Sequence, residues 1–234
     1  MPRSYGNRPR PVQAPWARHA LRAAVLILLT LTAGPIVAGT GEAAARTVKI
    51  VALGDSLTAG YGLPGSDSFP VKLEKALRAK GIDVAIENAG VSGDTASGGL
   101  ARLDWSVPDG TDAVIVELGA NDALRGIDPK LTRQALESIL LRLEARGIAV
   151  LLAGMRAPPN MGADYTAAFD AIFPELAAAH DVVYVPFFLD GVAADRTLNQ
   201  ADGIHPTAAG VDVIVARLLP QVEELIRRIS ARNP

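Results

Sequence analysis

The feature that most constrains the fold is an alternation, starting at Thr47, between short runs of β-branched and other apolar residues and longer amphipathic stretches. This alternation is typical of βαβ units, in which strands pair in parallel and helices cover the sheet. Some of the apolar runs hardly alternate with polar residues, so we expect those strands to be buried on both faces. The sequence predicts strands at residues 48–53, 84–87, 113–118, 148–153 and 182–185, of which the first, third and fourth are the buried ones.

Helical patterns lie between and after these strands. Pro129 and Pro206 suit a first helical turn, and Gly81 and Gly147 stand where a left-handed glycine would end a helix. We expect an α/β fold, a three-layer α/β/α sandwich with a five-stranded parallel sheet, and by analogy a flavodoxin-like strand order. Sites in such sheets open at the carboxyl ends of the strands. The predicted helices span residues 69–80, 129–146, 165–180 and 206–232.

The first 45 residues have the order of an export signal. Five arginines precede an apolar run at residues 23–38, and small residues follow as far as Ala45. The apolar run is about 16 residues long, whereas a membrane span needs roughly 20. We expect cleavage after Ala45, with a retained anchor as the alternative, and a single domain at residues 46–234. Cleavage would leave a periplasmic or secreted protein without a stable membrane span.

The charge and the absence of cysteine exclude several classes of protein. Residues 1–45 hold five of the 23 lysines and arginines and one of the 25 acidic residues, so the remainder carries a formal net charge of −6. This balance argues against a nucleic-acid partner. The chain has no cysteine, which excludes a thiol nucleophile, a disulfide framework and a cysteine zinc site. The length suits one core, and we expect a monomer.

A serine follows the first predicted strand, in the segment Gly54-Asp55-Ser56-Leu57-Thr58-Ala59-Gly60. A serine at this point would project into the crevice at the carboxyl edge with its hydroxyl accessible. The alternative is a helix N-cap or a turn, because Asp and Ser side chains satisfy free backbone N–H groups at such positions.

A carboxylate and an imidazole lie three residues apart near the carboxyl end of the chain. Asp202 and His205 flank a glycine, and Pro206 favours an extended backbone at His205 that turns the ring toward a neighbouring loop. A serine hydroxyl needs a base near neutral pH, and histidine supplies one. The other histidine after residue 45, His180, stands at a predicted helix end and is expected to be structural. The sequence therefore predicts Ser56, Asp202 and His205 as a catalytic triad.

Two more polar segments follow the second and third predicted strands, at residues 88–95 and 119–122. Each can supply N–H donors to the negative charge of a tetrahedral intermediate. We assign the N–H groups of Ser56 and Gly93 and the side-chain amide of Asn121 to this oxyanion hole. Ordinary turn chemistry is the alternative for each loop.

Together these segments resemble the SGNH (GDSL) hydrolase family, whose name lists the Ser, Gly, Asn and His found here as Ser56, Gly93, Asn121 and His205. The resemblance covers almost all of residues 48–210. Gly99-Leu100-Ala101-Arg102-Leu103, together with the segments around Ser56, Gly93 and His205, looks like the bacterial branch of multifunctional thioesterase I, lysophospholipase L1 and arylesterase.

The resemblance implies a substrate that is a small-molecule acyl ester or thioester, with aryl and alkyl esters, acyl thioesters and lysophospholipids in its range. It also implies a mobile loop at residues 122–126 and an acyl-site loop at residues 155–162. Ala120 and Ala123 stand where relatives often carry glycine. The implied substrate-binding residues are Asp122, Ala123, Leu124, Ala157 and Pro158.

The expected chemistry is acyl transfer through an acyl-enzyme on Ser56, with no cofactor and no metal. Asp55, Asp94 and Asp122 do not make a metal site, since only one histidine accompanies them and turns explain them. A carbohydrate or cell-wall O-acetyl esterase of the same fold is the alternative enzyme. A lipid- or glycan-binding module is the alternative without catalysis, whereas a nucleotide-binding module would need a phosphate loop that residues 54–60 lack.

Overall fold

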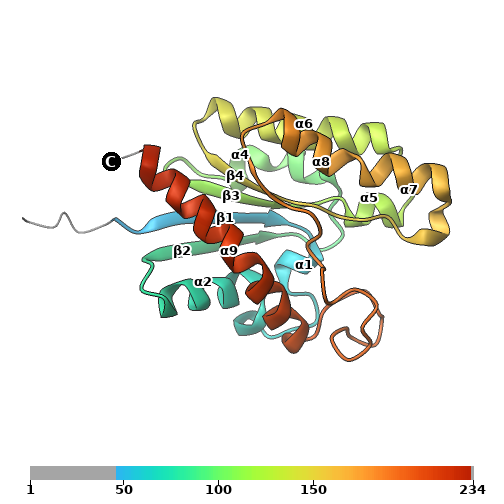
Figure 1. Ribbon diagram of the computed structural model, residues 1–234, viewed down its shortest axis with the longest axis horizontal. Helices are drawn as coiled ribbons and strands as arrows, with labels where there is room; N and C mark the ends of the chain where they lie inside the picture. Colours follow the sequence, from blue (N-terminus) through green and yellow to red (C-terminus); the bar gives the residue numbers. More distant parts are fainter. Residues whose placement is uncertain (1–45, 233–234) are drawn as a thin grey trace, which may run out of the picture. The chain divides into compact units, whose positions relative to one another are not determined.

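The computed structural model describes residues 46–232, and these form a five-stranded parallel sheet with helices on both faces (Figure 1). The strand order is β2-β1-β3-β4-β5, which confirms the predicted flavodoxin-like order. β1, β3 and β4 are buried almost throughout, as their unbroken apolar runs predict. The strands are β1 (Val48–Gly54), β2 (Val84–Gly90), β3 (Ala113–Glu117), β4 (Ala149–Ala153) and β5 (Val183–Val185).

Helices α2 and α9 pack against each other on one face of the sheet, and α3, α6, α7 and α8 cover the other face (Figure 1). The α-helices are α1 (Ser56–Ala59), α2 (Phe69–Ala79), α3 (Ala96–Ala101), α4 (Leu103–Ser106), α5 (Ala120–Leu124), α6 (Pro129–Ala145), α7 (Ala163–Asp170), α8 (Ile172–Ala179) and α9 (Ala208–Arg232). Two short 3₁₀ helices lie at Gly65–Asp67 and Pro159–Met161.

Two predicted helices differ from the structure. The helix predicted at residues 165–180 is two helices, because Pro174 has no N–H for the carbonyl of Asp170 and its ring crowds that carbonyl, so α7 ends at Asp170. The helix predicted from Pro206 begins at Ala208 instead. Pro206 pairs with Asn199 in an isolated antiparallel bridge, and the Thr207 side chain accepts from Gly210 N at 3.2 Å. Pro206 therefore precedes the helix rather than opening it.

Other predicted helix ends are confirmed within a residue. Pro129 is the first residue of α6, where Asp128 caps the helix by accepting from Lys130 N. Gly81 and Gly147 both have positive φ, at +80° and +68°, just after α2 and α6. The short helices α1, α3, α4 and α5 were not predicted, since four to six residues carry too little periodicity to be seen.

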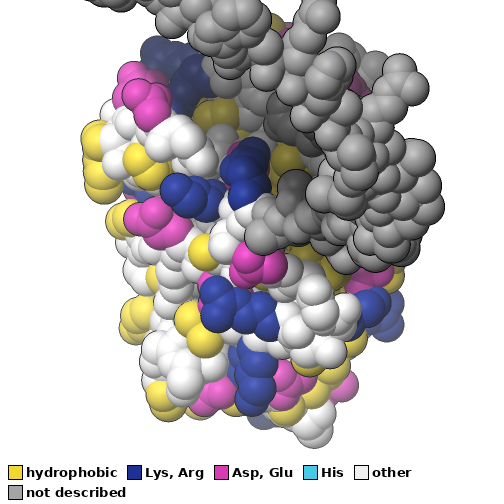
Figure 2. All heavy atoms as spheres, turned by 90° about the vertical axis from the view of Figure 1, so that its left-hand side faces the viewer, with side chains coloured by type: hydrophobic (Ala, Val, Ile, Leu, Met, Phe, Trp, Pro, Cys, Tyr) yellow, Lys and Arg dark blue, Asp and Glu magenta, His cyan; other side chains and the backbone are white. Residues whose placement is uncertain are grey.

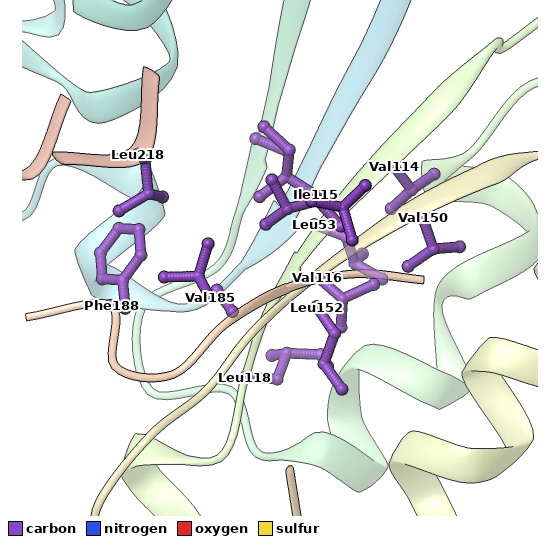
Figure 3. Packing of buried hydrophobic residues seen from close by; sticks show 14 of the residues in the cluster. Leu53, Val114, Ile115, Val116, Leu118, Val150, Leu152, Val185, Phe188 and Leu218 are labelled. Atoms are coloured by element: carbon purple, nitrogen blue, oxygen red, sulfur yellow. The ribbon is translucent and has the colours of Figure 1, made fainter. Parts of the chain in front are cut away.

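Apolar side chains from both faces of the sheet fill the core. Figure 3 shows Phe188 and Leu218 beside Val185. Leu53 of β1 lies opposite Val116 of β3 in the strand register. Phe188 also meets Phe69 of α2 edge to face, with ring centroids 5.0 Å apart. This packing fixes the carboxyl ends of the strands, where the polar segments emerge.

The surface at the amino ends of the strands carries side chains of both charges. On the face in Figure 2, Lys and Arg side chains lie among Asp and Glu side chains without forming a patch of one sign. Ion pairs that lie around these strand ends join Arg46 to Asp112 and Arg228 to Asp181. No helix within residues 46–232 is long and apolar enough to cross a membrane. The predicted leader, residues 1–45, lies outside the described residues.

The packing predicts that two leucine truncations differ strongly in their effect on the free energy of unfolding. Leu151→Ala removes a fully buried side chain from β4 and should lower the free energy of unfolding by about 2–5 kcal/mol. Leu141→Ala on α6, where the side chain is 52% exposed, should change it by less than about 1 kcal/mol. Urea unfolding followed by circular dichroism measures both. Equal losses would contradict the core described above.

Candidate active site

Ser56 is the first residue of α1, directly after β1. The Asp55 side chain caps this helix by accepting from Leu57 N at 2.9 Å, so the serine hydroxyl is not used as the cap. Gly60, with φ +80°, ends the helix after one turn. The N-cap explanation therefore holds for Asp55 and leaves the Ser56 hydroxyl for another partner.

That partner is His205. Its Nε2 lies 2.9 Å from Ser56 Oγ, and its Nδ1 lies 2.7 Å from Asp202 Oδ2. Asp202 Oδ1 accepts from the backbone N–H groups of Ile204 and His205 at 2.9 and 3.0 Å. These hydrogen bonds, the one with the His205 ring first, lower the pKa of Asp202 to about 2, so it stays ionised. The three predicted residues thus form a continuous hydrogen-bonded chain from carboxylate to hydroxyl.

An aromatic side chain that sequence reasoning missed lies against this histidine. The Tyr61 ring is 4.5 Å from the His205 ring, centroid to centroid, at an interplanar angle of 37°. Gln200 Nε2 donates to the Tyr61 carbonyl and to the Pro206 carbonyl, which ties the turn after α1 to the histidine loop. The position of Tyr61 just after Gly60 was the available signal. His180 is the C-cap residue of α8, at the helix end where it was predicted.

The predicted oxyanion segments converge beside Ser56. Gly93 has φ +85° in a turn closed by Asp94 N donating to Val91 O at 3.0 Å. Asn121 Nδ2 donates to Asp55 Oδ2 and to the Asp94 carbonyl, both at 2.9 Å. Asn121 therefore links the serine turn to the glycine turn. Since both amide hydrogens have acceptors, its donation to an oxyanion requires sharing or exchanging one of these bonds.

The residues implied for substrate binding divide into buried and accessible ones. Asp122 is fully buried and accepts from Ala96 N and Thr132 Oγ1, so its carboxylate faces the protein rather than a substrate. Ala123 and Ala157 are also buried, whereas Leu124 is 48% exposed and Pro158 is partly exposed. Among residues 46–232, no group of three or more His, Asp or Glu side chains is placed to hold a metal ion.

A second buried carboxyl group, which the sequence analysis did not single out, lies under the serine turn. Glu117 ends β3, is fully buried, and accepts from Thr58 Oγ1 at 2.7 Å and Asp55 N at 3.4 Å. Burial and the neighbouring Asp55 raise the pKa of Glu117 well above its ordinary value. Burial likewise raises the pKa of Asp55 to about 6, although Leu57 N and Asn121 oppose the shift. The apolar run of β3 that ends in a glutamate was the only signal.

These shifts predict how stability changes with pH. The folded protein keeps protons on Asp55 and Glu117 that the unfolded chain releases above about pH 4, so the free energy of unfolding should fall as pH rises from 4 through 6 and beyond. Glu117→Gln removes one of these titrations. Between pH 5 and pH 8 the variant should lose less stability than wild type does, because the amide cannot release a proton. Urea unfolding at each pH tests this, and parallel pH profiles would contradict it.

The sequence of this chain is similar to known hydrolases. The model of the GDSL-like Lipase/Acylhydrolase family matches residues 52–213. Esterase TesA of Pseudomonas aeruginosa is 40% identical over 188 residues, which are 80% of this chain and 92% of that protein. Thioesterase 1/protease 1/lysophospholipase L1 of Escherichia coli K12 is 39% identical over 206 residues, 88% of this chain and 92% of that protein.

Solved structures agree with this similarity. The crystal structure of TesA covers 76% of this chain and 99% of its own, with a TM-score of 0.72 and 39% identity. The crystal structure of AlinE4, an SGNH-hydrolase family esterase, covers 76% of this chain and 96% of its own, with a TM-score of 0.65 and 50% identity. On its sequence and its fold, this chain belongs to the GDSL-like Lipase/Acylhydrolase family of hydrolases.

Proposed function

We propose that the protein is a serine esterase that cleaves carboxylic esters and acyl thioesters through an acyl-enzyme. The observation that carries this proposal is the hydrogen-bonded chain of Asp202, His205 and Ser56, with 2.7 and 2.9 Å between its successive side-chain atoms. In the first step His205 Nε2 takes the Ser56 proton as Oγ attacks the carbonyl carbon. Asp202 orients the ring and stabilises the imidazolium that forms.

The proton then moves on to the leaving group. His205 donates it to the departing alcohol or thiol, and the acyl group stays on Ser56 Oγ. Water releases the acyl group in the second step, with His205 again as the base. The N–H groups of Ser56 and Gly93 and the Asn121 amide are proposed to stabilise the negative oxygen in both tetrahedral intermediates.

The names of the relatives support the proposed range of substrates. Relatives are named esterase, arylesterase of Vibrio mimicus, and thioesterase and lysophospholipase. We extend this range to small acyl esters and thioesters for the present chain. The exposed side chain of Leu124 and the partly exposed Pro158 are its proposed acyl contacts. We also propose export to the periplasm or outside the cell, on the strength of the leader sequence alone.

The first test of this function is the hydrolysis of nitrophenyl esters. Wild-type protein should release nitrophenol from p-nitrophenyl acetate, butyrate and octanoate, and Ser56→Ala should reduce kcat by more than about 10⁴-fold because no nucleophile remains. Ser138→Ala, which changes a serine of α6 whose hydroxyl donates to the Gln134 carbonyl, is the matched control and should keep activity within tenfold.

The dependence on chain length separates the alternatives. Turnover of butyrate and octanoate supports a general esterase, whereas turnover of acetate alone favours the O-acetyl esterase of sugars or cell wall. A Ser56→Ala variant as active as wild type would overturn the triad. A folded wild type without activity would instead favour a binding module.

A second test concerns the tautomer of His205. Asp202→Asn keeps an oxygen for the backbone N–H groups but turns an amide N–H toward His205 Nδ1, which favours the wrong tautomer. We expect kcat/KM to fall by about 10⁴ with little change in thermal stability. Asp195→Asn is the control, because Asp195 also accepts from a nearby backbone N–H, that of Thr197, outside the triad. Similar activities of the two variants would rule out a role for Asp202 in orienting the ring.

A further inference from the structure

Arg102 has no part in the proposed reaction, although it belongs to the motif at residues 99–103. It follows α3, and only 6% of its surface is exposed. Its Nε donates to Asp94 Oδ2 at 2.6 Å, and its Nη2 donates to the Gly54 carbonyl at 2.8 Å. Its Nη1 donates to the Ala89 carbonyl at 2.8 Å and to Ser106 Oγ at 3.1 Å. One buried guanidinium thus joins the ends of β1 and β2 to the turn that contains Gly93.

The Asp94 carboxylate fits closely between α3 and this guanidinium. A Cβ atom on Gly98 would lie 2.5 Å from Asp94 Oδ1, so glycine leaves the room that the carboxylate occupies. Arg102, directly after α3, lies one helical turn from Gly98, whose carbonyl accepts from Arg102 N at 3.3 Å. Charge-assisted hydrogen bonds of this kind are shorter and stronger than neutral ones, and they hold geometry well when both groups are largely buried.

The held carboxylate belongs to Asp94, which connects two of the three proposed oxyanion donors, Gly93 and Asn121. Asp94 directly follows Gly93, and its carbonyl accepts from the Asn121 amide at 2.9 Å. The Gly54 carbonyl that Arg102 binds also accepts from Val91 N at 3.0 Å, just before the Gly93 turn. Fixing Asp94 therefore fixes the backbone at Gly93 and the acceptor of Asn121 relative to the end of β1, where Ser56 is attached.

We infer that Arg102 is a positioning residue for the proposed oxyanion hole and that it acts through Asp94. This inference rests on the proposed function, since it concerns the donors of the same reaction. Arg102 touches no reacting atom. Its effect is to keep the donors in place before charge develops, so that no reorganisation accompanies the reaction.

Such a role affects the transition state more than the bound substrate. Loss of the Arg102–Asp94 pair should lower kcat and leave KM nearly unchanged, because the oxyanion donors act on the tetrahedral state. An alkyl trifluoromethyl ketone, which forms a tetrahedral oxyanion on serine, should lose affinity in parallel with kcat/KM. A loss of folded protein would instead lower the number of active sites. It would leave the kcat of each active site and the affinity for the ketone unchanged.

The experiment compares Arg102→Lys, Asp94→Asn and their double variant with wild type on p-nitrophenyl butyrate. Active sites are counted by titration with a nitrophenyl phosphonate. Arg78→Lys is the matched control, since Arg78 Nε donates to the Val84 carbonyl at the opposite edge of the sheet. Gly98→Ala presses on the Asp94 carboxylate without changing any charge, and Gly65→Ala, with open space around its Cβ, is its control.

We expect kcat per titrated site to fall about 10–100-fold in Arg102→Lys, Asp94→Asn and Gly98→Ala. KM should stay within twofold. Because Arg102 and Asp94 act as one pair, the kcat of the double variant should fall no further than that of the less active single variant. Kinetics within twofold of wild type in Asp94→Asn and Gly98→Ala would overturn the inference, even if Arg102→Lys fails to fold. Activity that survives in Ser56→Ala would overturn the proposed function as well, so the two failures are distinguishable.

Discussion

The parallel pairing of β1 with both β2 and β3 is the constraint on which the site depends. Gly54, the last residue of β1, lies opposite Gly90 of β2 and Glu117 of β3, so the three strands end at one level. The polar segments leave the sheet together from this level. Glycine is needed at both ends, because a Cβ on Gly90 would lie 2.2 Å from Ala59 N and one on Gly54 would lie 2.0 Å from Thr58 Oγ1. The first turn of α1 can cross the strand ends only without these side chains.

The same crossing explains why so many charged groups are buried at this edge. Asp55, Glu117 and Asp122 are fully buried, and Arg102 nearly so. Each ties a backbone segment that regular secondary structure leaves unpaired, since a buried polar group without a partner is costly. Glu117 Oε1 is an exception among the described residues, because it has no hydrogen-bond partner. A neutral carboxyl group at Glu117 is compatible with that environment, in line with its raised pKa.

The sequence predicted the elements and the pairing of Asp202 with His205 well, because both depend on local patterns. Unbroken apolar runs predicted β1, β3 and β4, and the spacing of Asp202 and His205 predicted that one turn would join them. Contacts between distant segments left no local pattern, so the tilted ring contact of Tyr61 with His205 and the acceptors of Asn121 were not predicted. The split between α7 and α8 could have been predicted from Pro174, but the apolar periodicity continues across it and hides the break.

The order of the proposed catalytic residues along the chain also has a consequence for biosynthesis. Ser56 lies just after the first strand, whereas His205 follows it by 149 positions and is held by a loop that α9 closes. A chain emerging from the ribosome therefore displays its proposed nucleophile early and without the proposed base. Under the proposed mechanism, the nascent polypeptide stays catalytically silent until the last quarter of the chain has folded onto the sheet and placed the imidazole.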